Sequence, residues 1–485
     1  MSKPKEGEFA MNLTLPGNPR YQPKSLVDIF GYDNLYKPII EVELATLHVL
    51  GEIGVIPTYH YMQLTPEIEE KILGICTTDV DELERIVTKH DIRALVRLIQ
   101  DIIPDDLKRW VHIPLTSYDP LETGRIIQYV RACRKVIAPR SREIIGILAG
   151  LVRKYAGTLQ IGRTHGQHAI PITVGFWLAT VLNRIVYNCR EIDKSAFALR
   201  GKISGAVGAS NAVRGLGIAE KCGRLSFESQ VLHKLGITPA HISTQILPPE
   251  PLAYFLFSTA MLSASFGQLG RDCRHLMRSE IAEIGEPFAE GQVGSSTMAQ
   301  KRNPINFENL EGMWLRTKNE FGKVLDTLMS EHQRDLVGSS VARDFPILVV
   351  NLVTQMETLL RKNEKGLTFL ERLTVNEENC KRNLQMSENF VLAEPLYVAL
   401  QMAGYKGDAH ELINRKVMPL AQEGNKPLLF ALNDLLYSEE ALTEAMLNIP
   451  ADVLSLLADP ENYTGDATAK AIEIADMAEE YLKKG

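Results

Sequence analysis

The chain has 485 residues, of which 45% are hydrophobic and 23% are charged, a balance typical of globular proteins and not of disordered or fibrous ones. This length exceeds the size at which a single hydrophobic core stops growing, so we expect two or three domains. The formal net charge of -7 excludes a global positive field that would attract nucleic acid or an anionic membrane. An anionic ligand therefore needs a local basic pocket.

The cysteines and the first residues of the chain indicate the cellular compartment in which we expect the protein. The six cysteines are scattered without a CxxC pair or metal-ligand spacing, which is typical of buried free thiols in a reducing compartment. The first residues lack the apolar stretch of a signal peptide, and no later run approaches a membrane span. We therefore expect a cytoplasmic protein that binds neither membrane nor nucleic acid, and we expect no metal and no other cofactor.

Residues 27–103 carry short amphipathic segments, which predict a small helical domain. From Leu121 to Tyr155 apolar residues recur with helical spacing, and Pro139 is expected to kink this helix without ending it. Four comparable long stretches follow, each introduced by a proline. They run from Pro171 to Gly201, from Pro251 to Gly285, from Pro304 to Glu331 and from Pro346 to Glu371.

These five long helices and the near absence of strand-like alternation predict an all-α fold with an elongated central bundle. Small residues between Tyr254 and Gly270 permit close helix packing, either within one subunit or between subunits. Beyond Thr374 the helical segments shorten again. We predict three helical domains, 1–113, 114–372 and 373–485, of which the central one carries the long helices.

The segment Gly291 to Pro304, GQVGSSTMAQKRNP, lies between two predicted long helices. Its glycines permit unusual backbone angles, its serines offer hydroxyl groups, and Lys301 supplies a charge that suits an anion. On these residues alone, a solvated connecting loop is an equally plausible interpretation.

This string resembles GSSxMPxKxN, the signature of the fumarase/aspartase superfamily, whose loop closes over substrate and carries the catalytic serine. The resemblance implies Ser295 as the catalytic base. The substrate-binding residues that it implies here are Ser296, Met298, Lys301 and Asn303. The sequence departs from the pattern at Ala299 and Gln300, where the nearest family members usually carry Pro and His, and the missing proline is expected to loosen the loop.

The segment Gln160 to Pro171, QIGRTHGQHAIP, concentrates histidines just before a predicted helix. Imidazole exchanges protons near physiological pH, so such a cluster at a helix end is a credible acid/base station, although a lone histidine is more often structural. The segment is similar to GRTHGQxAxP of the adenylosuccinate lyases, a family of that superfamily. This resemblance implies His165 as general acid and Thr164 as a substrate-binding residue.

A third segment, WVHIPLTSYDPLETG, directly precedes the first long helix. Taken alone, its Thr, Ser and Asp are more readily turn and helix-capping residues. It resembles the lyase segment HxGLTSxD, which contacts substrate carboxylate and phosphate-ribose groups, and this implies that His112, Thr116 and Ser117 bind substrate. Pro114 replaces the usual Gly, which is expected to stiffen the loop.

Finer matches to the adenylosuccinate lyases run from about residue 20 to about residue 400 and add further implied substrate-binding residues. They are Arg20 and Tyr21 in PRYQPKSL, His90 and Asp91 in an HDxxA motif, Gln245 in ISTQIL, and Arg334, Ser339 and Arg343 in HQRDLVGSSVARDF. The last three have the spacing by which the family grips a nucleotide phosphate. Guanidinium groups suit this role because they form bidentate, charge-assisted bonds, although a surface ion-pair patch is the alternative. KISGAVG, with Lys202, resembles another stretch that lines the family's active site.

The resemblance implies a carbon-nitrogen lyase that eliminates fumarate from succinylated purine nucleotides: from adenylosuccinate, giving AMP, and from SAICAR, giving AICAR. It also implies a homotetramer in which three conserved regions from three subunits share each active site. One alternative is a superfamily lyase that acts on another succinylated amine or on a carboxymuconate-type substrate. A non-catalytic helical scaffold is disfavoured, because such a protein has no reason to keep both Ser295 and His165.

Overall fold

The computed structural model of the chain describes residues 15–18, 22–287, 298, 300–438 and 440–484. The chain divides into two units. Unit 1 consists of Met1–Ser141, Tyr187–Gly267 and Glu311–Thr358, and unit 2 consists of Arg142–Val186, Gln268–Leu310 and Leu359–Gly485. Each unit thus draws on three separate stretches of sequence. The division into domains 1–113, 114–372 and 373–485 is a different partition and stays a prediction.

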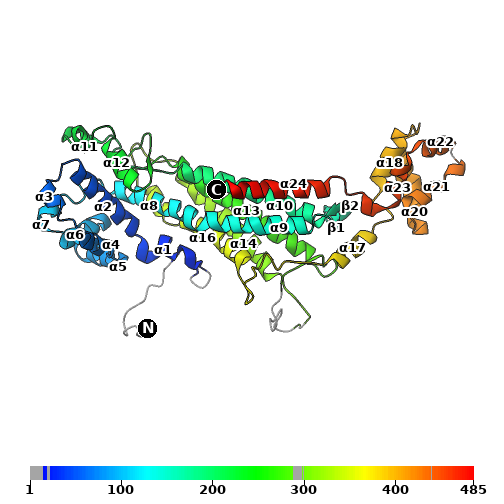
Figure 1. Cartoon of the computed structure of the whole chain (residues 1–485), viewed down its shortest axis with the longest axis horizontal. Coiled ribbons are helices and arrows are strands. Elements are labelled where there is room, and N and C mark those ends of the chain that lie inside the picture. Colours follow the sequence, from blue (N-terminus) through cyan, green and yellow to red (C-terminus); the bar gives the residue numbers. More distant parts are fainter. Residues whose placement is uncertain (1–14, 19–21, 288–297, 299, 439, 485) are drawn as a thin grey trace. The chain divides into compact units, whose positions relative to one another are not determined.

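Long helices dominate the described residues, and the all-α class is confirmed (Figure 1). They are α8 (Tyr118–Ala132), α9 (Ala138–Lys154), α10 (Val174–Phe197), α13 (Glu250–Leu276), α14 (Ile305–Asp326) and α16 (Pro346–Leu360). A π-helical turn, Cys133–Ile137, joins α8 to α9 just before Pro139. Because a proline removes one backbone hydrogen bond and crowds the preceding turn, it distorts this helix without ending it, as predicted.

The remaining helices are mostly shorter, although α2 has 16 residues and α24 has 17. Those of unit 1 are α1 (Val27–Phe30), α2 (Lys37–Glu52), α3 (Thr58–Tyr61), α4 (Pro66–Leu73), α5 (Thr77–Leu83), α6 (Asp91–Ile102), α7 (Asp105–Lys108), α11 (Asn211–Gly215), α12 (Phe227–Lys234) and α15 (Val337–Ala342). Those of unit 2 are α17 (Glu377–Gln385), α18 (Ala393–Met402), α19 (Ala409–Leu412), α20 (Met418–Gly424), α21 (Leu428–Asn433), α22 (Glu440–Asn448), α23 (Ala451–Ala458) and α24 (Ala467–Lys483). The segments beyond Thr374 are short as predicted, except α24 with 17 residues.

The strands are few and short. An antiparallel hairpin pairs β1 (Leu159–Thr164) with β2 (Gln167–Thr173). The remaining pairs are β3 (Arg200–Gly201) with β4 (Thr238–Pro239), and β5 (Ile284–Gly285) with β6 (Thr374–Val375). The helix predicted from Pro171 begins instead at Val174, because the residues up to Thr173 complete the hairpin.

Each unit has its own buried apolar residues. In unit 1, the rings of Phe30, Tyr129 and Phe255 form a chain in which successive centroids lie 5.3 and 6.0 Å apart. In unit 2, α18 to α23 enclose a separate core that includes Leu400, Val417 and Leu442. Burial of this kind contributes about 25 cal/mol per Å² of apolar surface. All six cysteines are free thiols, and five are buried as expected, whereas Cys76 is exposed.

Two stretches correct the expectation that no run approaches a membrane span. By length and composition, α13 and the stretch Val337–Leu360 are apolar enough to cross a membrane, with mean hydropathies of 1.3 and 1.2. α22 and α23 together pass the same test, but they are bent by 103°. Of the most apolar part of each of the first two stretches, 61% and 44% are buried inside the protein. A helix that packs on several sides within a protein needs the same apolar composition.

Candidate functional site

The structure distributes the predicted site residues over both units. Unit 1 contains His90, Asp91, His112, Thr116, Ser117, Gln245, Arg334, Ser339 and Arg343. Unit 2 contains Thr164, His165, Met298, Lys301 and Asn303. Arg20, Tyr21, Ser295 and Ser296 lie outside the described residues.

Arg334 is the centre of a polar group in unit 1. Its Nη1 donates a hydrogen bond to Gln245 Oε1 at 2.6 Å, and its guanidinium carbon lies 3.3 Å from the centre of the Tyr118 ring. The Tyr118 hydroxyl lies 2.5 Å from the Ser339 hydroxyl. Three predicted residues therefore meet around Tyr118, which sequence reasoning missed. Its position directly after Ser117 in the TSYD motif was the available signal.

The start of α8 fixes the position of Tyr118. Thr116 and Ser117 lie half-buried just before the helix, and the Thr116 amide donates to Asp119 Oδ2 at 2.8 Å. Asp119 Oδ1 accepts hydrogen bonds from Lys202 Nζ at 2.5 Å and from the Ser204 amide at 3.0 Å. Because Asp119 and Lys202 are both buried, this pair is well satisfied and expensive to break. Lys202, expected to line an active site, here anchors the start of α8.

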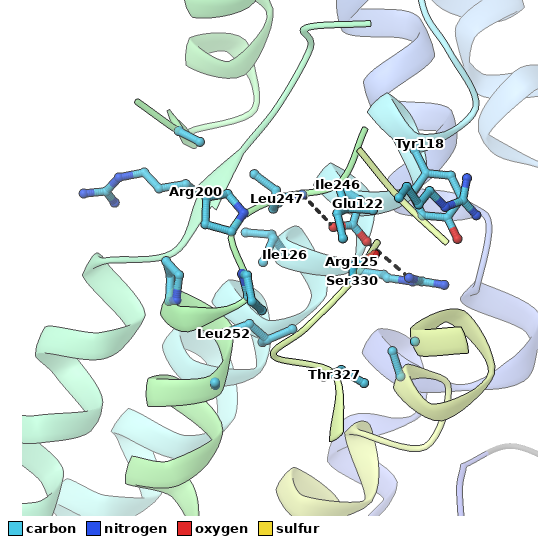
Figure 2. A pocket seen from close by; sticks show the side chains of 18 of the residues that line it. Tyr118, Glu122, Arg125, Ile126, Arg200, Ile246, Leu247, Leu252, Thr327 and Ser330 are labelled. Carbon is cyan, nitrogen blue, oxygen red and sulfur yellow. Dashed lines mark hydrogen bonds and ion pairs between the residues drawn. The ribbon is translucent and has the colours of Figure 1, made fainter. Parts of the chain in front are cut away.

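A cavity of about 370 Å³ adjoins the Arg334 group in unit 1. Figure 2 shows its wall of α8 side chains, which includes Glu122 and Arg125. Glu122 accepts a hydrogen bond from the Leu247 amide at 3.1 Å, so this carboxylate is already engaged by the protein. By contrast, the buried Nε of Arg334 has no hydrogen-bond partner among the described residues. Buried donors are normally paired, so this N–H is available to an acceptor from a ligand.

His112 is tied to α2 by a buried carboxylate. Its Nδ1 lies 2.7 Å from Oε1 of Glu43, whose side chain is fully buried. Burial lowers the pKa of His112, but the hydrogen bond and charge of Glu43, with a smaller effect of Asp119, outweigh it. The net pKa of His112 is therefore raised, which favours the imidazolium form.

His90 and Asp91 form a second, more exposed group. His90 Nδ1 lies 3.1 Å from Asp91 Oδ1, and their side chains are 49% and 37% exposed. Burial and the charge of Asp91 raise the pKa of Glu84, while the charges of His90 and Arg343 counteract that rise. Arg343 is exposed, and its positive charge acts on Glu84. Of the predicted phosphate-binding set, Ser339 therefore contacts Tyr118 of the Arg334 group, and the charge of Arg343 acts on Glu84.

His165 lies at the tip of the β1–β2 hairpin, which corrects its predicted place at a helix end. Thr164 pairs with Gln167, so His165 and Gly166 are the two turn residues, with φ of 55° and 76°. Positive φ at both positions is the geometry that matches the twist of a hairpin. Thr164 and His165 are both exposed. The hairpin therefore presents the predicted general acid to a ligand instead of burying it.

The same hairpin carries a second histidine close to the turn, because His168 pairs with Arg163 directly below the pair of Thr164 with Gln167. His168 Nδ1 lies 2.7 Å from the Ser387 hydroxyl. Burial lowers the pKa of His168, and the charge of Arg163 lowers it further against a smaller opposite effect of Glu283. His168 is therefore favoured in its neutral form and suits a structural hydrogen bond better than a catalytic proton transfer.

Lys301 and Asn303 lie just before α14. Lys301 is exposed and its amide donates to Met298 O at 3.0 Å, whereas Asn303 is half-buried. The N-terminus of a helix attracts anions, so a lysine beside it suits a developing negative charge. Within the described ranges, no three His, Cys, Asp or Glu side chains lie close enough together to hold a metal ion.

Fold and motifs together define a class of enzyme. Residues 76–317 match a family model described as lyase. The fold is similar to the crystal structure of 3-carboxy-cis,cis-muconate lactonizing enzyme from Pseudomonas putida, with a TM-score of 0.78, 22% sequence identity, and coverage of 95% of this chain and 98% of that chain. The chain is a lyase with the fold of the fumarase/aspartase superfamily.

Full-length relatives specify the family within that class. The chain is 31% identical over 473 residues to the adenylosuccinate lyase of Pyrococcus abyssi, which covers 96% of this chain and 98% of the relative. It is also 31% identical over 469 residues to the adenylosuccinate lyase of Archaeoglobus fulgidus, with the same coverage of both chains. This chain belongs to the adenylosuccinate lyase family.

Proposed function

We propose that the protein eliminates fumarate from adenylosuccinate, giving AMP, and from SAICAR, giving AICAR, as a step of purine biosynthesis in the cytoplasm. Family membership over nearly the whole chain supports the reaction. The presence of the elimination motif and of the nucleotide-binding motifs in one sequence supports these two substrates.

The Arg334 group is the single observation that carries the proposal for a nucleotide substrate. A guanidinium that is stacked on Tyr118 and hydrogen-bonded to Gln245 is fixed in orientation. Its buried Nε keeps a free donor among the described residues, and the Ser339 hydroxyl provides a neutral donor nearby through Tyr118. A phosphate accepts bidentate, charge-assisted bonds from such an arrangement.

Elimination makes two chemical demands. The carbon beside a carboxylate must lose a weakly acidic proton, and the resulting dianion must be stabilised by fixed positive charge and oriented donors. We propose Ser295 as the base and Lys301 with Asn303 as the stabilising groups. The departing nitrogen must then be protonated, and His165 at the exposed hairpin tip is the proposed acid. None of these steps requires a metal or another cofactor.

Substrate choice has one serious rival within the same fold. Ala299, Gln300 and Pro114 depart from the motifs of the family, and the fold is also similar to that of a muconate lactonizing enzyme. A related lyase that acts on another succinylated amine or on a carboxymuconate-type substrate is therefore the alternative. The free donor of Arg334 beside Ser339 favours a phosphate-bearing substrate.

A panel of substrates separates these possibilities. Purified protein is incubated with adenylosuccinate, SAICAR, argininosuccinate and a carboxymuconate, and release of fumarate or loss of substrate is followed by ultraviolet absorbance. We expect fumarate from the first two only. Activity on argininosuccinate or the carboxymuconate, with none on the two nucleotides, would move the assignment to the rival.

We also propose a homotetramer in which subunits share active sites. Large apolar side chains on the long helices of unit 1 support an assembly: Tyr187, Tyr254, Phe257 and Leu315 are 62%, 66%, 46% and 44% exposed. Inactive Ser295→Ala subunits mixed with inactive His165→Ala subunits should regain part of the activity after dissociation and reassociation, because some hybrid sites then contain both intact residues. Hybrids that form without regaining activity would contradict shared sites.

A further inference from the structure

Glu283 ties the hairpin of His165 to the rest of unit 2. Its side chain is fully buried and accepts two bonds from Arg163, at 2.6 Å to Oε1 and 3.0 Å to Oε2. Gln160 Nε2 donates to Oε2 at 2.8 Å, and Asn383 Nδ2 donates to Oε1 at 2.8 Å. Gln160 and Arg163 belong to β1 and Asn383 belongs to α17, which lies next to β1 (Figure 1). One carboxylate thus holds the strand that ends at Thr164, directly before His165.

Glu286 performs the equivalent task for α14. Its Oε1 accepts a hydrogen bond from the Phe307 amide at 2.8 Å, and its Oε2 accepts one from Asn306 Nδ2 at 2.6 Å. The side chain is 6% exposed. A carboxylate at the first turn of a helix satisfies free amides and interacts favourably with the helix dipole. This cap comes from outside the helix and fixes the point where the chain passes from Asn303 into α14.

The two glutamates belong to one anchored segment. They are three residues apart and flank β5, which pairs with β6. The Glu283 carbonyl accepts a further bond from the Asn376 amide at 2.8 Å. Both carboxylates therefore project from a stretch whose backbone is itself held by neighbouring chain.

We propose that Glu283 and Glu286 are positioning residues that set two catalytic groups from one rigid segment, Glu283 acting through His165 and Glu286 acting through Lys301 and Asn303. This inference rests on the proposed elimination reaction. Neither glutamate touches the substrate in this account. Each restricts the backbone that carries a reacting group, because a carboxylate with bidentate or doubly donated bonds tolerates little displacement. Misplacement of a reacting group by about 1 Å can cost about 10²-fold in rate.

The single variants Glu283→Gln and Glu286→Gln should each lower kcat by about 10²-fold while KM changes little. The amide retains the size of the side chain, but it places a donor where Asn383 or Asn306 also donates. If Glu283→Gln does not fold, the paired change Glu283→Gln with Arg163→Met removes both buried charges together and keeps the measurement possible.

Double variants distinguish positioning from general damage. If one residue acts only through another, removing both lowers the rate no more than removing the second alone. Glu283→Gln should cost nothing further in a His165→Ala protein, yet its loss should multiply with that of Lys301→Ala. Glu286→Gln should show the reverse pattern. Fumarate release in single turnovers measures all four combinations. A matched control, Val417→Ala in the separate core of α18 to α23, destabilises unit 2 without touching either carboxylate.

Losses that multiply in all four combinations, as those of Val417→Ala should, would overturn the positioning roles while leaving the proposed function intact. The proposed function fails in a different way, since wild-type protein would then release no fumarate from either nucleotide. The inference is supported if Glu283→Gln adds no loss to His165→Ala and Glu286→Gln adds none to Lys301→Ala, while the losses multiply in the other two double variants.

Discussion

The Arg334 group of unit 1 and the His165 hairpin of unit 2 are built in opposite ways. Arg334 is held in place by direct contacts with Gln245 and Tyr118. His165 itself is exposed. The strand that leads to it is held by the ion pair of Arg163 with Glu283, whose side chains are 14% and 0% exposed. A group that recognises a fixed charge gains from being assembled in advance. A group that transfers a proton must reach the reacting atom. The contacts that hold the hairpin are therefore made by Arg163, a neighbour of His165, and not by His165 itself.

The largest effect tests the hairpin side of this comparison. His165→Ala and Ser295→Ala should each lower kcat by roughly 10²-fold to 10⁴-fold, because loss of a catalytic acid or base commonly costs that much. Steady-state fumarate release measures it, and circular dichroism checks the fold. His410→Ala, at an exposed histidine of α19, is the matched control and should retain normal turnover. Near-normal turnover of His165→Ala would remove it as the acid.

A smaller effect sharpens the unit 1 side. Arg343→Leu should weaken binding of nucleotide substrates more than it harms folding, because a bond to a charged group contributes about 1.5 to 3 kcal/mol. This corresponds to a rise in KM of about tenfold to a hundredfold. Arg224→Leu, at another exposed arginine of unit 1, should leave KM unchanged. An unchanged KM in Arg343→Leu would place the phosphate with Arg334 and Ser339 alone.

The smallest effect concerns stability against pH, where the two units should respond in opposite directions. The pKa of His112 is raised, so its ion pair with Glu43 stabilises fully below the unfolded pKa of about 6.5 and is lost as pH rises through the folded pKa. The pKa of His168 is lowered, so its contribution is present above about pH 6.5 and is lost as pH falls through the folded value.

Urea unfolding measures both effects between about pH 5 and pH 8, the range in which histidine titrates. Glu43→Gln should flatten the decline on the alkaline side, and His168→Gln should flatten the decline on the acid side. A wild-type profile that Glu43→Gln leaves unaltered would show that the raised pKa of His112 does not contribute to stability.

The sequence predicted the long helices well, because their apolar periodicity extends over many turns. The distortion before Pro139 was also predictable, because a proline inside a helix removes a backbone hydrogen bond. It did not predict the β1–β2 hairpin, because β2 continues directly into the strongly helical pattern of α10. The alternation around Ile161 and the His165-Gly166 pair are the local signals of this tight turn.

The contacts beneath the site were beyond the reach of sequence patterns. Arg163 and Glu283 lie 120 positions apart, and nothing local indicates that they meet. Arg334 and Arg343 posed the opposite difficulty. They are close in sequence, but α15 lies between them: Arg334 bonds to Gln245, whereas the charge of Arg343 acts on Glu84.

We propose a division of labour in which the Arg334 group recognises phosphate and the hairpin carries the acid of the elimination. Comparing kcat/KM for adenylosuccinate with that for the same compound lacking its phosphate tests this division directly. Wild-type protein should strongly prefer the phosphorylated substrate. His165→Ala should be slow on both compounds yet keep that preference, whereas Arg334→Met should lose most of it. An Arg334→Met protein that still prefers the phosphorylated compound as strongly as wild type would contradict the account.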